Sequence, residues 1–332
     1  MSAVPRTVAS RRDSIGSRLS PWASQIGIVT AFVLLWLAFV ILAPRTFLDA
    51  PIYLSFAQTT PYFAIIAMAL TMVIVAGDID LSFPATMSLG MVGFVFAWQA
   101  TGVVALGVLA ALGVGILCGL FNGFFVTVVG IPALVVTIGT QFLFRGVALV
   151  LVGGRQYPLV QTQDSIAYEA MVGRMFGIPM EFFWFLLVTV GTWILLNRHR
   201  LGQNAYVVGD NAQAAALMGI PIRRTRIVLF VLVGLAAALA GVLNSLQVVN
   251  YYPSMGDGYL LPALAAVFVG GTSVFGGRGT VLGTALGAFM IGGIQAGLVA
   301  VGLSDYYPSL VYGAVILISV SIHAVLRRRF EY

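Results

Sequence analysis

The sequence predicts an all-α membrane protein. We expect a polytopic helical bundle of about ten transmembrane segments, some of them short or broken, with both termini in the cytoplasm. Of the 332 residues, 60% are hydrophobic and 8% are charged, and the mean hydropathy is +1.02. A soluble domain has about 25% charged residues, so this composition indicates many spans and not a single anchor. The apolar runs are continuous, which excludes the short alternating segments of an outer-membrane barrel.

Ten apolar segments are candidate spans. Most of them approach the roughly 20 residues that a helix needs to cross about 30 Å of hydrocarbon. Two segments, 85–100 and 259–271, are short and adjoin polar, glycine-rich breaks, which in transporters often border the substrate path. The ten predicted spans are 26–43, 52–76, 85–100, 103–128, 131–152, 181–197, 225–247, 259–271, 281–302 and 306–326.

The arginines predict the orientation of these spans. The net charge is +6, the sequence contains no lysine, and the arginines gather in both tails and in the loop 198–226. Basic residues beside spans mark the cytoplasmic side, so we read the charge as a topology signal and expect no nucleic-acid partner. The loop 153–180 then lies outside. The predicted organisation is a tail at 1–25, one transmembrane domain at 26–326 and a tail at 327–332.

Two aspartates follow the second predicted span, in the stretch A-G-D-I-D-L-S at 76–82. A charge at the bilayer centre costs about 2.5–3.5 kcal/mol on insertion scales. Three interpretations are open. Asp78 and Asp80 are solvated at the cytoplasmic end of the preceding span, or Asp80 or Ser82 caps the next helix, or the carboxylates line a path for a hydroxylated solute. We expect first a helix break and second a gate.

The loop 201–222 contains the signals of a short helix. Asp210 or Asn211 is suited to cap its first turn, four alanines favour helix, and Gly219 and Pro221 end it. The predicted helix spans about two turns, over 211–218. It is either a connector or, because small side chains let a partner approach the backbone, a contact for a soluble protein.

Small and neutral polar residues mark the remaining spans. Glycines recur every four residues from Gly115 to Gly123 and from Gly279 to Gly287, which predicts close helix packing. Glycines at 270, 271, 276, 277 and 279 interrupt the segment 267–284, which we expect against the central pathway or the cytoplasmic gate. Arg145, inside a span, snorkels, pairs with an acid or marks a tilted helix. The neutral polar residues within apolar runs fit an uncharged polar solute better than an ion: Gln58, Asn122, Gln141, Asn244, Gln247 and Gln295.

Three segments in order carry a resemblance to a known family. They are G-D-I-D-L-S at 77–82, G-Q-N-A-Y-V-V-G-D-N-A-Q-A-A-A-L-M-G-I at 202–220 and V-F-V-G-G-T-S-V-F-G-G-R-G-T-V-L-G-T at 267–284. Together they resemble the permease subunit of bacterial ATP-binding-cassette sugar importers of the ribose/xylose/galactose type, over roughly 50 to 325. The chain departs from the family at Asp78, where glycine is usual, at Phe83-Pro84, and after Asn211, where acidic residues are usual.

The resemblance implies function and partners. It implies an inner-membrane permease that forms the path for a sugar or sugar-like neutral solute. The implied partners are an ATPase subunit with two cassettes, which binds ATP-Mg, an external sugar-binding protein and a second permease copy, identical or related. The chain itself is expected to bind no cofactor or metal and to hold no catalytic residue. Without lysine it has no G-x-x-x-x-G-K-[ST] phosphate loop.

The resemblance and the polar residues within the apolar runs together supply the candidate site residues. Asp80 matches the family motif and is the aspartate expected to matter for function. We expect Ala215→Arg to uncouple ATP hydrolysis from uptake. The expected ATPase-coupling residues are Gly209, Asp210, Asn211, Ala214, Ala215, Leu217 and Gly219. The expected pathway or gate residues are Asp80, Ser82, Asn122, Asn244, Gly271 and Ser273.

Two rival classes of protein remain open on the sequence alone. An ion-coupled secondary transporter needs an intramembrane charged site, for which Asp78, Asp80 or Arg145 are available. A membrane enzyme is poorly supported, because His199 and His323 both lie near arginines at predicted cytoplasmic ends. No nucleophile or metal constellation accompanies them.

Overall fold

The computed structural model of the protein describes residues 21–300, 302–303 and 306–330. Parts of the two predicted tails, residues 1–20 and 331–332, lie outside the described residues. The described chain is mostly helical, as predicted. Its strands form two short antiparallel pairs, β1 (Tyr157–Pro158) with β4 (Asn250–Tyr251) and β2 (Arg174–Met175) with β3 (Ile178–Pro179).

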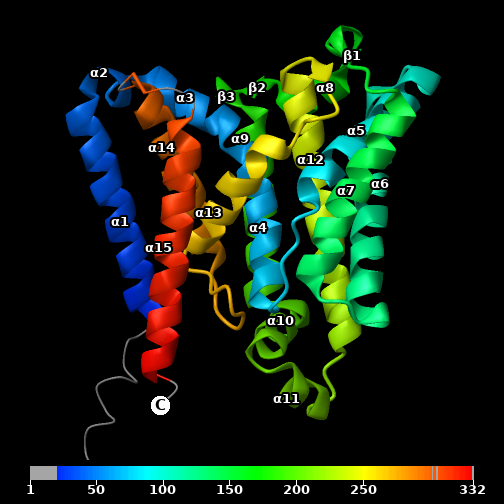
Figure 1. Ribbon diagram of the computed structural model, residues 1–332. Helices are drawn as coiled ribbons and strands as arrows, with labels where there is room; N and C mark the ends of the chain where they lie inside the picture. The colour runs from blue at the N-terminus through cyan, green and yellow to red at the C-terminus, as the bar shows by residue number, and fades with distance from the viewer. Residues whose placement is uncertain (1–20, 301, 304–305, 331–332) are drawn as a thin grey trace, which may run out of the picture.

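Most of the long helices run along one common direction and form a bundle (Figure 1). In chain order the helices are α1 (Pro21–Leu42), α2 (Pro44–Phe47), α3 (Ala50–Thr59), α4 (Pro61–Val75), α5 (Phe83–Thr101), α6 (Val104–Phe124), the π-helix η2 (Phe125–Val129), α7 (Ala133–Val152), the 3₁₀ turn η3 (Val160–Thr162), α8 (Ile166–Val172), α9 (Met180–Asn197), α10 (Arg200–Asp210), α11 (Ala212–Leu217), α12 (Ile222–Gln247), the 3₁₀ turn η4 (Asp257–Tyr259), α13 (Leu260–Val269), α14 (Val281–Ala300) and α15 (Tyr307–Phe330).

A helix lies at each of the ten predicted spans, but their lengths differ. Within the described residues, five helices are long and apolar enough to cross a membrane: α6 continued by η2, α7, α9, α12 and α14. The number is six if α3 and α4 together count as one span. These two helices are separated by Thr60 and are bent by 51° relative to each other. The count of about ten spans therefore stays a prediction.

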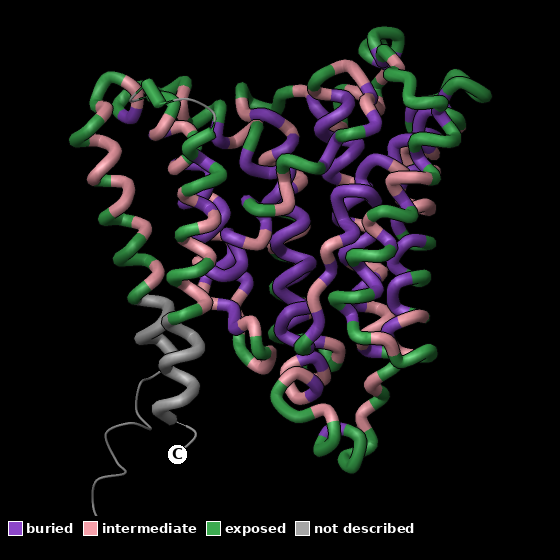
Figure 2. Tube along the Cα trace, in the orientation of Figure 1, coloured by how far each residue is buried: buried purple, intermediate pink, exposed green. Residues whose placement is uncertain are grey.

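Helix α4 is the centre of the bundle. All fifteen of its residues are buried, and it contacts α12, α9, α13 and α14. A helix that is apolar on every face is stable in such a central position. The buried residues concentrate around it, whereas the outward faces of the peripheral helices are exposed (Figure 2). The predicted span 52–76 thus consists of two helices, the peripheral α3 and the central α4, with the bend at Thr60.

Glycines bring neighbouring helices into backbone contact, as their spacing predicts. A Cβ atom on Gly115 or Gly119 of α6 would lie 2.4 and 2.5 Å from carbonyl oxygens of α12. A Cβ atom on Gly283 or Gly287 of α14 would lie 2.1 and 2.2 Å from the carbonyl oxygens of Gly270 and of a residue in α13. These distances are shorter than any van der Waals contact, so only glycine permits this packing.

The connections fall at two opposite ends of the bundle (Figure 1). We call the end that carries α10 and α11 the inner end, and the end that carries β1, β2, β3 and α8 the outer end. Helix α1 begins and α15 finishes toward the inner end. The loops 198–226 and 153–180 therefore lie at opposite ends, as the charge pattern predicts. The assignment of the inner end to the cytoplasm stays a prediction.

Candidate functional site

The three segments that carry the family resemblance meet at the inner end. The backbone N–H of Gly277 donates a hydrogen bond of 2.9 Å to the carbonyl oxygen of Val75, at the end of α4. A Cβ atom on Gly209, in α10, would lie 1.8 Å from that oxygen and 2.8 Å from the Gly277 nitrogen. One on Gly276 would lie 2.8 Å from the Gly209 oxygen. We call Val75, Gly77, Gly209, Gly276 and Gly277 the glycine junction.

The backbone angles of the junction explain its composition further. Gly77, Gly276 and Gly277 have φ values of +86°, +82° and +70°, in the left-handed region that glycine adopts at little cost. Gly209 lies in a helix, so its backbone angles do not call for glycine. Glycine is required there because a Cβ atom would overlap the Val75 carbonyl oxygen. The junction therefore joins the end of the central helix, helix α10 and the loop after α13 without any intervening side chain.

Side chains secure the loop of the junction. The Tyr206 hydroxyl donates to the carbonyl oxygen of Gly279 at 2.7 Å, and burial raises the pKa of Tyr206, so the phenol keeps its proton. Ser273 binds the loop to itself: its N–H donates to the Arg278 carbonyl oxygen at 2.9 Å, and its hydroxyl oxygen accepts from the Phe275 N–H at 3.2 Å. Gly271 has φ +81°. The structure thus places Gly271 and Ser273 in the loop that forms the junction.

The short helix predicted in the inner loop is confirmed as α11. The Asn211 side chain accepts a hydrogen bond of 3.0 Å from the Ala214 N–H, as a helix cap does, and Gly219 has φ +74° at the other end. Leu217 is 92% exposed, so the rest of the described chain leaves its apolar side chain uncovered.

Ala215 requires a correction. It is 0% exposed, packed against this chain, so its side chain offers no direct contact to a soluble partner. The apolar surface that α11 presents consists of Leu217 and of Met218, which is 70% exposed. Met218 was not predicted as a site residue. In the sequence, Met218 stands out only as an apolar residue at the end of the predicted short helix.

Helix α10 was not predicted from the sequence. Its two glycines, Gly202 and Gly209, disfavour helix by about 1 kcal/mol each relative to alanine. Tertiary contacts decide the outcome, because a Cβ atom on Gly202 would lie 2.2 Å from the Leu196 carbonyl oxygen and one on Gly209 would overlap Val75. The same glycines that weaken the helix signal are required for the helix to dock against α9 and α4.

The structure brings three predicted pathway residues together in one buried cluster. Asp80 Oδ1 accepts hydrogen bonds from the Ser82 N–H at 2.8 Å and from the Ser82 hydroxyl at 2.7 Å. Asn122, on α6, donates to Ser82 Oγ at 2.7 Å and to Asp80 Oδ2 at 3.4 Å. Asp80 is only 2% exposed, so the interpretation of a solvated aspartate is wrong. These contacts hold the segment between α4 and α5 against α6.

The cap of α5 comes from another helix. Ser82 is the residue before α5, but its side chain makes no capping hydrogen bond. Gln141 of α7 takes this role, because its Oε1 accepts from the Ala85 N–H at 3.0 Å. Thr137, also on α7, donates to the Ile79 carbonyl oxygen at 3.3 Å. Asp80 therefore orders the residues before α5, while a distant side chain caps the helix itself.

Asp78 is held by an ion pair. Its Oδ2 lies 3.0 Å from Nε of Arg226, in the first turns of α12, and Asp78 is 8% exposed. The solvated interpretation is therefore wrong for this aspartate too. The pair joins the end of the inner loop to the helix break, one residue away from the glycine junction.

A second polar group lies at the outer end. Asn244 Nδ2 donates to the Tyr259 hydroxyl at 2.8 Å, and the Tyr62 hydroxyl donates to Glu181 Oε1 at 3.4 Å. The rings of Tyr62 and Tyr259 lie 6.2 Å apart. Among the described residues, neither Glu181 Oε2 nor Asn244 Oδ1 has a hydrogen-bond partner, although both are buried. We call these four residues the outer polar group.

The outer polar group was predicted only in part. Asn244 was among the predicted pathway residues, but it lies with Tyr259 and not with the Asp80 cluster. Glu181 was missed, because a carboxylate at the first residue of a predicted span, 181–197, looks like an exposed helix end. Arg145 also lies toward this end. It pairs with Asp257 and donates to the Met255 carbonyl oxygen at 3.2 Å. Of the three interpretations of Arg145, pairing with an acid is therefore confirmed.

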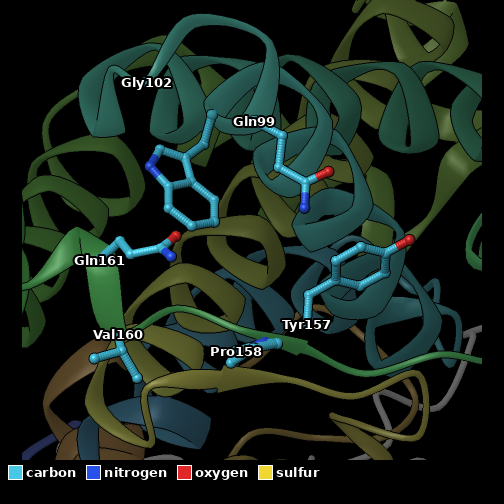
Figure 3. Close-up of a pocket in the computed structure, with 7 residues that line it drawn as sticks. Gln99, Gly102, Tyr157, Pro158, Val160 and Gln161 are labelled. Atoms are coloured by element: carbon cyan, nitrogen blue, oxygen red, sulfur yellow. The ribbon is translucent and has the colours of Figure 1, made fainter.

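An open pocket of about 650 Å³ lies at the outer end, between the end of α5 and β1 (Figure 3). Gln99 and Gln161 direct their amide groups toward its centre from opposite sides, and the ring of Tyr157 borders it. The lining carries no formal charge, which suits a neutral partner or solute. Its residues are Trp98, Gln99, Gly102, Tyr157, Pro158, Val160 and Gln161.

Comparison with known families decides the class of the protein. The family model described as branched-chain amino acid transport system / permease component matches residues 52–320. The chain belongs to this permease family. The match covers all three segments that meet at the glycine junction, so the resemblance stated from their sequence is confirmed.

Curated relatives of the permease span most of its length. The autoinducer 2 import system permease protein LsrD of Salmonella paratyphi A is 31% identical over 328 residues, which cover 92% of this chain and 95% of the relative. LsrD of Photorhabdus luminescens is 34% identical, covering 84% and 85%. LsrD of Yersinia enterocolitica is 33% identical, covering 78% and 81%. These relatives are transport permeases and not enzymes. No solved structure matches the permease.

Proposed function

We propose that this permease forms the translocation path of an ATP-driven importer for a sugar-like, neutral solute. The observation that carries the proposal is the glycine junction. It connects helix α10, which directly precedes the exposed helix α11, with the helix break at 76–82 through close backbone contacts. A push on α11 from a soluble motor would therefore reach the buried Asp80 cluster without compressing a flexible side chain.

The proposed coupling surface is the exposed side of α11 with the residues before it. Leu217 and Met218 supply its apolar contacts, and Asn211 with Gly219 fixes the ends of the helix. Gly209 transmits displacement to Val75 and the loop after α13. Asp210 and Ala214 are both exposed beside this surface. Ala215, whose side chain is buried, packs α11 against the rest of the permease.

The proposed path has a polar group at each end. Asp80, Ser82 and Asn122, on the side of the glycine junction, act as the inner gate, supported by the loop that contains Gly271 and Ser273. Asn244, with the rest of the outer polar group, lies near the outer entrance. Carboxylate, amide and phenol groups hydrogen-bond to hydroxyl groups, so the path suits a polyhydroxylated solute. The import of autoinducer 2 by the relatives supports a sugar-like solute for this permease.

The proposed architecture is a single transmembrane domain over 26–326 with about ten spans. The inner end, both tails and the loop 198–226 face the cytoplasm, and the loop 153–180 faces the outside. The arginine distribution supports this orientation, because basic residues accumulate beside the cytoplasmic ends of spans. The protein then resides in the bacterial inner membrane, with lipid around its exposed apolar faces.

The proposed partners follow from the energy source. The chain has no lysine and so no phosphate loop, which supports a separate ATPase subunit with two cassettes that binds ATP-Mg. An external binding protein delivers the solute, and the neutral outer pocket at α5 and β1 is suited to meet it. A second permease copy, identical or related, completes the path.

The ion-coupled alternative is not favoured by the site. Asp78 and Arg145 are both used in ion pairs within the chain, and Asp80 accepts three hydrogen bonds from its neighbours. None of these three groups is therefore available to bind a coupling ion.

The test is transport in vesicles. The permease is reconstituted with its ATPase and binding protein, and uptake of labelled ribose, xylose, galactose and autoinducer 2 is measured. Uptake of at least one solute is expected to stop with vanadate and to continue with a protonophore. Uphill accumulation by the permease alone, driven by a proton or sodium gradient, would overturn the proposal.

A further inference from the structure

A pocket of about 520 Å³ lies at the inner end, where α9 finishes and α12 begins. Its walls are apolar, formed by Leu201, Ile220, Pro221 and Val228, and the remaining lining includes Asn204, Gly219 and Thr225. Three basic side chains complete it: His199, Arg200 and Arg224. The pocket therefore combines an apolar wall with a concentration of positive charge.

The charge of this pocket is not neutralised within the described part of the chain. The two ion pairs found there involve Arg145 and Arg226, so neither Arg200 nor Arg224 has a carboxylate within 4.0 Å. The Nδ1 atom of His199 accepts the Leu201 N–H at 3.1 Å. Only Nε2 of that ring is then left to donate to a bound group. Two exposed guanidinium groups beside one pocket repel each other unless an anion lies between them.

Neighbouring residues place the pocket at the level of a membrane surface. Arg198 lies over the ring of Trp193, with 5.6 Å from the guanidinium carbon to the ring centroid. Tryptophan and arginine are typical of the interface between hydrocarbon and headgroups. Trp193 and Ile194 are exposed near the end of α9, six and five residues before His199, the first residue that lines the pocket. An apolar outer surface of the bundle thus leads to the basic pocket.

We propose that this pocket binds an anionic phospholipid of the inner leaflet. Its phosphate lies between Arg200 and Arg224, and its glycerol and upper acyl groups lie against Leu201, Ile220 and Val228. Basic pockets between transmembrane helices bind anionic headgroups in this way. A free phosphate would leave the apolar wall uncovered. A segment of the ATPase is less suited, because the apolar residues that α11 exposes, Leu217 and Met218, do not line this pocket.

The bound lipid would join the start of α10 to the start of α12, on either side of α11. It therefore stabilises the orientation of the inner loop without contacting the glycine junction. The proposal does not depend on the solute or on the motor, since it concerns the permease and the bilayer alone.

The test compares two pairs of arginines. The full-length permease is purified, and dissociation constants for phosphatidylglycerol and phosphatidylcholine are measured by native mass spectrometry. We expect R200Q/R224Q to bind phosphatidylglycerol about tenfold more weakly than the unchanged permease. R198Q/R223Q removes the same charge from adjacent positions that do not line the pocket, so its affinity is expected to change less than about threefold. Phosphatidylcholine is expected to bind weakly to all three proteins.

A further variant and a competition experiment distinguish the phospholipid from other ligands of the pocket. R200K/R224K keeps the charge and is expected to bind phosphatidylglycerol within about threefold of the unchanged permease, which separates charge from folding. Excess inorganic phosphate is expected not to displace the lipid, and displacement would indicate a simple anion site and overturn the proposal. Equal affinity of the two glutamine variants would overturn it as well. So would a loss of ATPase co-purification in R200Q/R224Q with lipid binding intact.

Discussion

The inner end and the outer end of the permease differ in the closest contacts that each contains. At the inner end, the glycine junction places backbone against backbone, with no room for a single Cβ atom at Gly209. The inner end also has side-chain contacts, including the Asp78–Arg226 ion pair, but the outer polar group consists of side-chain hydrogen bonds without such a backbone junction, and an ion pair and an open pocket lie at the same end. Under the proposed function, this difference assigns the transmission of force to the inner end and rearrangement to the outer end.

The physical basis of this difference is stiffness. Backbone contacts between packed elements cannot yield, so a displacement of α10 displaces Val75 and the loop at Gly277. A side-chain hydrogen bond contributes only about 0.5–1.5 kcal/mol and exchanges readily with water or solute hydroxyls. Under the proposed function, the outer end would exchange its internal hydrogen bonds for those of a solute, and the inner end would move as one unit.

The largest effect is expected at the junction. Gly209→Ala puts a Cβ atom 1.8 Å from the Val75 carbonyl oxygen, so the backbone must shift. Overpacking of this kind costs about 3 kcal/mol of unfolding free energy, and uptake is expected to be lost. The measurement is unfolding of the purified permease in mixed micelles, followed by circular dichroism, together with uptake in vesicles.

Gly139→Ala is the matched control for the junction. Gly139 is also helical, but a Cβ atom there meets nothing within 4 Å. Alanine favours helix over glycine by about 1 kcal/mol, so this variant is expected to be neutral or more stable. Equal stability of the two variants would contradict the rigid junction.

The next effect concerns the ion pair beside the junction. Asp78→Asn leaves Arg226 without its carboxylate and is expected to lower the unfolding free energy by about 2 kcal/mol. The double variant Asp78→Asn/Arg226→Gln is expected to lose less than the sum of the single variants, because both then remove the same interaction. Additive losses in the same unfolding assay would show that the pair contributes nothing at the inner end.

A smaller effect is expected on the surface of α11. Leu217→Arg places a charge where an apolar side chain is 92% exposed, and we expect about tenfold weaker binding of the ATPase subunit with unchanged stability. Gln203→Arg, on the exposed side of α10, adds the same charge outside this surface and is expected to bind normally. Binding is measured by titration of the purified subunits. Ala215→Arg is expected to disturb the fold of α11 itself, since that side chain is buried.

The sequence predicted the helices better than it predicted their junctions. Long apolar runs and glycine spacing indicate spans and close faces, because both signals are local in the chain. The meeting of Gly77, Gly209 and Gly276 depends on three distant segments, and nothing in any one of them specifies the others. Helix α10 was missed for the same reason, since its glycines weaken the local signal and are explained only by tertiary contact.

The candidate site shows the same limit. The three residues of the Asp80 cluster were all among the predicted pathway residues, Asp80 because it matches the family motif and Asn122 because it is a polar residue in an apolar run. Their role in a pathway stays a prediction. The cap from Gln141, the partner of Asp78 and the group around Glu181 were not, because they depend on which helix faces are adjacent. Ala215 and Leu217 are two positions apart on one short helix, and only packing decides which of them is buried.

The smallest effect is expected in the outer polar group. Tyr62→Phe removes the hydrogen bond of 3.4 Å to Glu181 and is expected to cost about 1 kcal/mol of unfolding free energy, well below the cost at Gly209. Tyr312→Phe is the matched control, because the Tyr312 hydroxyl is buried and has no hydrogen-bond partner among the described residues. Removing an unpaired hydroxyl is expected to be neutral or stabilising. If Tyr62→Phe were as destabilising as Gly209→Ala, the outer end would be as rigid as the inner end, and the division of the molecule into a transmitting and a rearranging half would not hold.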